Sequence, residues 1–149
     1  MQLPRSTYIV CDPCYVMLEE AYSQLCDQMY PSNWATDGIV SDLKINGHNL
    51  WVHNTRFGDG IYESNSSVKF MVDSGSLGAI PLELCNMDEV NRLLAEKNAV
   101  LFTDEVVYTG YYEGTFTFAL EVTELVIFTD DDPEDRYYED EHDELFGDE

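Results

Sequence analysis

The sequence predicts a β-dominated α+β fold, with a mostly antiparallel sheet, small barrel or sandwich, two helices and an acidic C-terminal tail. Short β-branched and aromatic runs separated by turn residues fill most of the chain, and only two segments show the 3.6-residue period of an amphipathic helix. Most strand connections are too short for the crossovers that parallel strands require. Apolar residues make up 44% of the 149 residues, which is enough for a core. We expect one globular domain over residues 1–129 and a tail over residues 130–149.

The chain begins with a predicted strand and helix. Residues 7–10 form a β-branched and aromatic run that stops at Cys11-Asp12-Pro13, because proline donates no ladder hydrogen bond and restricts the residue before it. Residues 18–29 then carry apolar side chains at i, i+3, i+4, i+7, i+8 and i+11. This spacing predicts a first helix that ends before Pro31.

The middle of the chain reads as short strands joined by tight turns. Asn46-Gly47 is typical of a type I′ turn, so the flanking residues 39–45 and 48–54 should form a hairpin in which Leu43 faces Leu50. Glycines then punctuate the chain. They leave short strands at residues 61–62 and 68–73, and a partly extended run at 77–84 that carries a proline.

A second helix should begin after Asn86 as N-cap, with Glu89 completing a capping box. Its predicted inner face carries Val90, Leu93 and Leu94, and it should end near Lys97.

The last part of the fold is predicted as three strands. Residues 106–112 and 115–123 alternate around the Glu113-Gly114 turn, and residues 125–128 form one more strand. The alternation of Val106, Tyr108 and Tyr112 leads us to assign the tyrosines of this strand, including Tyr111, to the core.

Charge is the outlying property of the sequence. Thirty carboxylates against seven Lys and Arg give a net charge of −23. This balance argues against direct binding of nucleic acid or anionic membranes, which both require basic clusters. We expect a basic or nucleic-acid-binding protein as partner, and no cofactor. The N-terminus shows no export signal and no segment is apolar enough for a membrane span, so we expect a cytoplasmic protein with reduced cysteines.

About half of the net charge lies after residue 129, where twelve carboxylates face a single Arg136. This tail is either disordered until bound or an acidic amphipathic helix. Tyr137 and Tyr138 have no core to join there, so they are predicted anchors in charge-steered docking. The predicted partner-binding residues are Asp130, Asp131, Asp132, Glu134, Asp135, Tyr137, Tyr138, Glu139, Asp140, Glu141, Asp143 and Glu144.

The pair Cys11 and Cys14, after a strand and before a helix, resembles the position of a redox thiol pair. The following Asn-Gly hairpin does not supply the βαβ unit of that fold, so buried structural thiols are the alternative. A zinc site is not favoured, because Cys26 and Cys85 are isolated. No acidic run matches the twelve-residue calcium loop, and we expect no metal.

Asp59 and Asp73 each lie beside or near glycine on turns. They could act as an acid and base pair if the fold brings them close, or they could simply cap turns. No catalytic triad order and no phosphate-binding glycine loop is present. We therefore favour binding over catalysis.

Three motifs together resemble a group of small phage and bacterial proteins of unassigned function. They are Asp12-Pro13-Cys14-Tyr15, Gly58-Asp59-Gly60-Ile61-Tyr62 and Val72-Asp73-Ser74-Gly75. The resemblance implies a phage origin and carries over no catalytic residue. It marks five residues whose role it leaves open, namely Asp12, Cys14, Asp59, Tyr62 and Asp73.

Separately, the overall charge is similar to that of DNA-mimic anti-restriction proteins. Our leading hypothesis is a phage-encoded acidic inhibitor that blocks a host DNA-binding defence or repair protein by DNA mimicry. The alternatives are a non-enzymatic virion or assembly accessory protein, and a thiol-disulfide oxidoreductase that uses Cys11 and Cys14. The sequence leaves the oligomeric state open, including a dimer.

Overall fold

The computed structural model describes residues 1–29 and 39–130, together with the side chains of all of these except residues 39–42. Most of the predicted tail therefore lies outside the described residues. No helix in the described part of the chain is long and apolar enough to cross a membrane.

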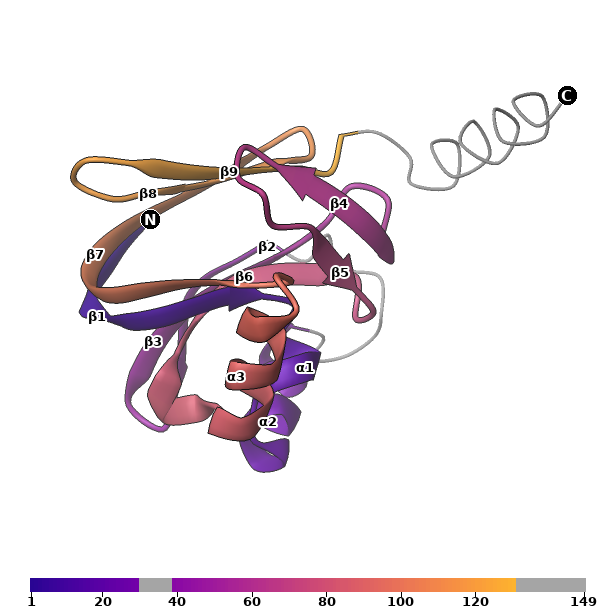
Figure 1. Cartoon of the computed structure of the whole chain (residues 1–149). Helices are drawn as coiled ribbons and strands as arrows, with labels where there is room; N and C mark the ends of the chain where they lie inside the picture. Colours follow the sequence, from indigo (N-terminus) through magenta and orange to yellow (C-terminus); the bar gives the residue numbers. More distant parts are fainter. Residues whose placement is uncertain (30–38, 131–149) are drawn as a thin grey trace, which may run out of the picture.

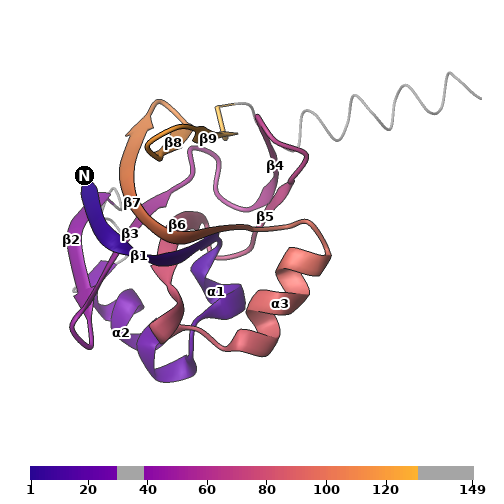
Figure 2. The ribbon, with the colours of Figure 1, turned by 60° about the vertical axis from the view of Figure 1, so that its left-hand side comes forward.

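The described strands form one antiparallel sheet that curls into a half-barrel, with the helices packed on one side of it (Figures 1 and 2). This confirms the predicted β-dominated α+β class. The strand order is β2-β3-β6-β1-β7-β8-β9-β4-β5. The elements are β1 (Gln2–Cys11), α1 (Pro13–Val16), α2 (Glu19–Met29), β2 (Ile39–Ile45), β3 (His48–Asn54), β4 (Gly60–Ser64), β5 (Phe70–Val72), β6 (Ser76–Pro81), α3 (Met87–Ala95), β7 (Val100–Tyr112), β8 (Thr115–Ala119) and β9 (Glu124–Phe128).

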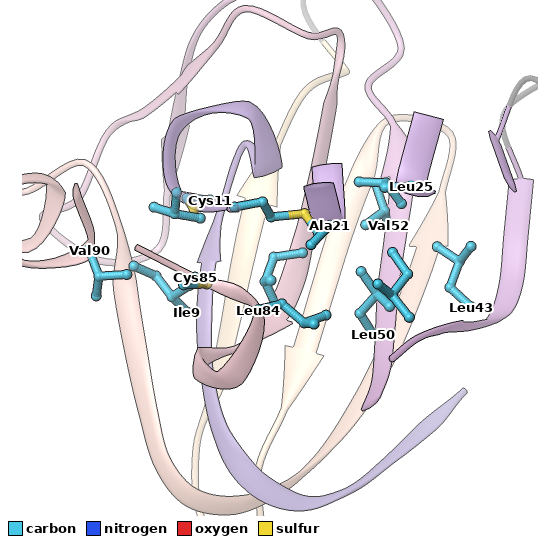
Figure 3. Close-up of a cluster of buried hydrophobic side chains, with 14 of the residues drawn as sticks. Ile9, Cys11, Ala21, Leu25, Leu43, Leu50, Val52, Leu84, Cys85 and Val90 are labelled. Atoms are coloured by element: carbon cyan, nitrogen blue, oxygen red, sulfur yellow. The ribbon is translucent and has the colours of Figure 1, made fainter. Parts of the chain in front are cut away.

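The sheet has apolar clusters on both of its faces. The first cluster packs the helices against β1, β2, β3 and β6, as Figure 3 shows for Leu25 and Leu50. The second fills the interior of the half-barrel, with large aromatic side chains such as Phe116 and Phe118. Because successive side chains of a strand point to opposite faces, β1 contributes Ile9 to the first cluster and Val10 to the second.

The predicted hairpin is confirmed. Asn46 and Gly47 have φ angles of 51° and 82°, as a type I′ turn requires, and Leu43 pairs with Leu50 in the register. Here local turn chemistry was sufficient to fix the pairing.

Both predicted helices are present, and one detail of their capping differs. α2 buries Ala21, Leu25 and Met29, and the Asn86 side chain accepts hydrogen bonds from the backbone of Asp88 and Glu89, as an N-cap does. Glu89 does not complete the capping box.

The Glu89 carboxylate binds Arg92 instead. The backbone N–H of Asn86 donates to the backbone oxygen of Val16. The backbone N–H that Glu89 would accept in a capping box is thus already bonded to another part of the fold. The short helix α1, which begins at Pro13, was not predicted.

The assignment of Tyr108 and Tyr112 to the core was wrong, since both are exposed. Val107 faces the interior instead, and Tyr111 is half-buried. The cause is an irregularity earlier in the same strand. Asp104 has a φ of 55°, and the pairing of β1 with β7 shifts register beside it. A bulge of this kind moves the in-and-out alternation by one residue.

Candidate functional site

The first and third motifs meet in three dimensions around one buried carboxylate. Asp12 ends the connection from β1 into α1, and its side chain is fully buried. Its Oδ1 accepts from the Cys14 amide at 2.9 Å and from the Ser74 hydroxyl at 2.6 Å. Its Oδ2 accepts from the amides of Asp73 and Ser74, each at 2.7 Å. We call these residues, together with Tyr15, the Asp12 junction.

Tyr15 closes the junction from the outside. Its hydroxyl donates to Oδ2 of Asp73 at 2.5 Å, so the turn before β6 is attached to α1 a second time. The Ser74 hydroxyl also lies 3.0 Å from that of Ser76. Sequence reasoning picked out Asp12 and Asp73 but missed Tyr15 and Ser74 as their partners. Both belong to the same two motifs, which is the signal that would have found them.

The second motif divides into a structural and an exposed part. Tyr62 is fully buried, and its hydroxyl donates to the backbone oxygen of Gly58 at 2.8 Å. The Thr55 hydroxyl donates to the same oxygen at 2.6 Å, so two side chains fix this loop. Asp59 is exposed. Tyr62 therefore supports the loop from the core, whereas Asp59 faces solvent.

The fold does bring Asp59 and Asp73 to the same neighbourhood. Burial raises the pKa of the Cys14 thiol, and the negative charges of Asp12, Asp73 and Asp59 raise it further. A Cβ on Gly75 would lie 3.9 Å from Oδ1 of Asp59, which places this carboxylate against the turn that also carries Asp73.

Burial and the neighbouring carboxylates keep the thiols and the phenol in and beside the junction protonated. Burial also raises the pKa of Cys11 well above its ordinary value and that of Cys85 to about 12. Burial and the hydrogen bond to Asp73 raise the pKa of the Tyr15 phenol. Thiolates are the reactive species in disulfide exchange. These shifts therefore do not favour the oxidoreductase alternative, and the four cysteines are free thiols in the structure.

No three or more His, Cys, Asp or Glu side chains within residues 1–29 and 43–130 are placed to hold a metal ion. The Asp12 carboxylate has four donors bound to it and no free position for a substrate proton. The junction therefore joins the start of α1 to the turn before β6.

An aromatic group closes the interior of the half-barrel next to the end of β3. His53 stacks on Tyr111 with ring centroids 3.7 Å apart, and Phe116 packs edge-on against both rings. Burial lowers the pKa of His53, and its Nδ1 lies 2.7 Å from the backbone oxygen of Asn54. We assign this histidine a packing role, because its ring packs in the cluster as the neighbouring aromatic rings do.

The acidic surface is the other candidate for function. Among the described aspartate and glutamate side chains, only Asp12 is buried. Both ion pairs in the described part of the chain involve Arg92 of α3, which contacts Glu89 and Glu96 on its own helix. Most of the negative charge of the folded body is thus presented to solvent without a cationic partner among residues 1–29 and 43–130.

One predicted partner-binding residue lies within the described residues. Asp130 is exposed and follows Thr129, which is held to the backbone oxygen of Gly114 by its amide and its hydroxyl. The chain therefore leaves the body beside the turn between β7 and β8. The other eleven predicted residues lie outside the described residues, and they are Asp131, Asp132, Glu134, Asp135, Tyr137, Tyr138, Glu139, Asp140, Glu141, Asp143 and Glu144.

Comparison of the chain with protein-family models, curated proteins and solved structures found no match.

Proposed function

We propose that this protein acts by binding, and that its negative surface occupies the cationic site of a DNA-binding defence or repair protein and so inhibits it. One observation carries the proposal: a net charge of −23 is combined with a folded body whose described carboxylates, Asp12 apart, are not buried. The phage origin implied by the three motifs belongs to this proposal and places the target in a bacterial host.

Physical chemistry supplies the mechanism. Duplex DNA carries one negative charge per about 1.7 Å of its axis, and proteins that bind it present Lys and Arg to these phosphates. A protein surface with a high density of carboxylates can compete for the same side chains. Such self-repulsive charge destabilises a fold when no partner is present. Little of it is offset within the described residues, where Arg92 is the one cation that forms ion pairs.

The chemistry of the Asp12 junction also favours binding over catalysis. Its carboxylate is saturated with hydrogen bonds, and the pKa values of Cys14 and Tyr15 are raised, so it offers neither an activated nucleophile nor a free base. The first and third motifs, and Tyr62 of the second, thus stabilise the body on which the charge is displayed.

The test is competition with DNA. The full-length protein, immobilised through an N-terminal tag, is incubated with a bacterial lysate at about 50 and 200 mM salt, the range over which phosphate-like contacts weaken most clearly. Bound proteins are then eluted with a short DNA duplex. We expect proteins that bind DNA, recovered far better at low salt and released by the duplex.

A variant in which the twelve carboxylates of residues 130–149 are changed to Asn and Gln measures the share of the tail, because it keeps the chain length. Recovery of a partner that binds equally at both salt concentrations, or that holds the duplex and this protein together, would contradict the proposal. The second outcome would instead favour an accessory role in virion assembly or a similar complex.

A further inference from the structure

The half-barrel has an outer face that no described helix covers. The second half of β7, after Asp104, and strands β8, β9, β4 and β5 turn one side toward the interior cluster and the other side away from the helices (Figures 1 and 2). On a half-covered sheet the outward positions are normally polar. Here five of them carry large apolar side chains, and we call this surface the outer face: Tyr108, Tyr112, Phe128, Ile61 and Met71.

The strand register shows that these side chains share one side of the sheet. Tyr112 pairs with Thr115, Thr115 pairs with Phe128, and Phe128 pairs with Glu63. Residues directly opposite each other project to the same side, as do residues two apart on one strand. This reasoning adds Ile61, two residues before Glu63 on β4, and its partner Met71 on β5.

The apolar residues of the outer face are well exposed. The exposed fractions are 50% for Tyr108, 66% for Tyr112, 56% for Ile61, 39% for Met71 and 38% for Phe128. Four strand spacings separate β7 from β5, so the face is roughly 19 Å wide, and four residues separate the two tyrosines by roughly 14 Å. These dimensions suit a segment of several residues.

Carboxylates lie among these rings. Glu63 stands beside Phe128 in the register, and Glu124 ends the row that runs from Tyr108 through Ala119. Lys69 precedes β5 and forms no ion pair with a described carboxylate. Arg56 lies at one edge, where its guanidinium donates to the backbone oxygen of Glu113. The outer face thus combines exposed aromatic rings with carboxylates, and it belongs to a chain whose net charge is −23.

We propose that the outer face binds an arginine-rich segment of the partner, an inference that rests on the proposed function. A guanidinium stacks on tyrosine rings and can bind a carboxylate through two parallel hydrogen bonds, whereas an ammonium is a compact, strongly hydrated charge. Charge complementarity selects this occupant. A second copy of the chain would bring another net −23 to the surface, and nucleic acid would be repelled in the same way.

The test uses two fluorescent peptides, nona-arginine and nona-lysine, whose binding to the full-length protein is measured by fluorescence anisotropy. We expect tighter binding of nona-arginine, with each engaged ring adding at most about two- to fivefold to this preference. The double variant Tyr108→Ser/Tyr112→Ser should lose this preference and still bind both peptides. The double variant Glu63→Gln/Glu124→Gln should weaken both peptides more than its control, Asp27→Asn/Glu83→Gln, which removes two exposed charges on the helical side.

The outcomes separate the two proposals. If wild type binds both peptides equally and the outer-face variants match the control, the inference is wrong while charge-driven binding stands. If wild type binds neither peptide at low salt, the proposed function itself fails. Amide chemical-shift mapping of wild type with nona-arginine gives the same decision without any substitution. Shifts along β7, β9 and β4 support the outer face, and shifts confined to the helices or to residues 131–149 overturn it.

Discussion

Replacing Asp12 with alanine should be among the most damaging single substitutions in the chain. The carboxylate accepts four hydrogen bonds from the Cys14, Asp73 and Ser74 backbone amides and the Ser74 hydroxyl. Alanine removes every acceptor and leaves these donors next to a small cavity. The perturbation thus removes one of the two attachments between α1 and the turn before β6, which are some 60 residues apart in sequence, and leaves only the bond from Tyr15 to Asp73.

The magnitude follows from the number of donors. A hydrogen bond contributes about 1 kcal/mol net, and bonds to a charged group contribute more. Four such bonds at a partly buried junction, where water can replace some of them, give an expected loss of about 3 to 5 kcal/mol. Natural domains are stable by only about 5 to 15 kcal/mol, so the variant should be folded marginally or not at all at 37 °C.

Urea and thermal unfolding followed by circular dichroism measure this loss, and two variants sharpen it. Asp12→Asn keeps one acceptor oxygen and can reverse the bond to Ser74, so it should lose only about 1 to 2 kcal/mol. Asp59→Asn makes the same chemical change on an exposed carboxylate nearby and should stay within about 0.5 kcal/mol of wild type.

The order of stability is the decisive result. If Asp12→Ala lies within 1 kcal/mol of wild type, or if Asp59→Asn costs as much, the junction does not stabilise the fold and our reading of the motif is wrong.

Three further predictions rest on local geometry. Gly78→Ala should cost about 3 kcal/mol or more by urea unfolding, because its Cβ would overlap the Trp51 backbone oxygen, whereas Gly110→Ala, with nothing within 4 Å, should be tolerated. In a Cys26→Ser background, iodoacetamide should label Cys14 in the native protein at least about tenfold more slowly at pH 8 than in urea, because a raised pKa suppresses the thiolate; equal rates would refute this. By NMR, the pKa of His53 should lie below its ordinary value of about 6.5, because burial disfavours the charged ring. The unfolded chain then binds this proton more readily than the folded chain, so the protein should lose stability as the pH falls from about 7 to 5. His53→Phe should remove this loss of stability, and a variant whose free energy of unfolding depends on pH as wild type does would contradict the prediction.

Features that depend on neighbouring residues were predictable from the sequence. The Asn46-Gly47 turn fixed the hairpin register, and Asn86 identified the start of α3, because in both places a few adjacent residues supply the interaction. The first helix followed in the same way from its apolar period. The fold class then follows from the sum of such elements.

Features that depend on distant residues were not predictable. The interior face of β7 changes at the bulge at Asp104, where the pairing with β1, about 100 residues earlier, shifts register. Because the sequence does not reveal this bulge, it did not show that Val107 and not Tyr108 would face the core. The Asp12 junction is similar: its motifs are visible in the sequence, but only the folded chain shows that Tyr15 and Ser74 complete it.

The place of β1 in the sheet has a consequence for synthesis of the protein. This strand precedes both of its partners in the chain by many residues, since β6 begins at Ser76 and Gln2 pairs with Tyr108. Pairings of such long sequence separation slow folding. During synthesis β1 therefore cannot complete its pairing until β7 has been translated, about 100 residues later. In that interval residues 1–108 carry fifteen carboxylates against six Lys and Arg, so part of the negative charge is already present to keep neighbouring nascent chains apart.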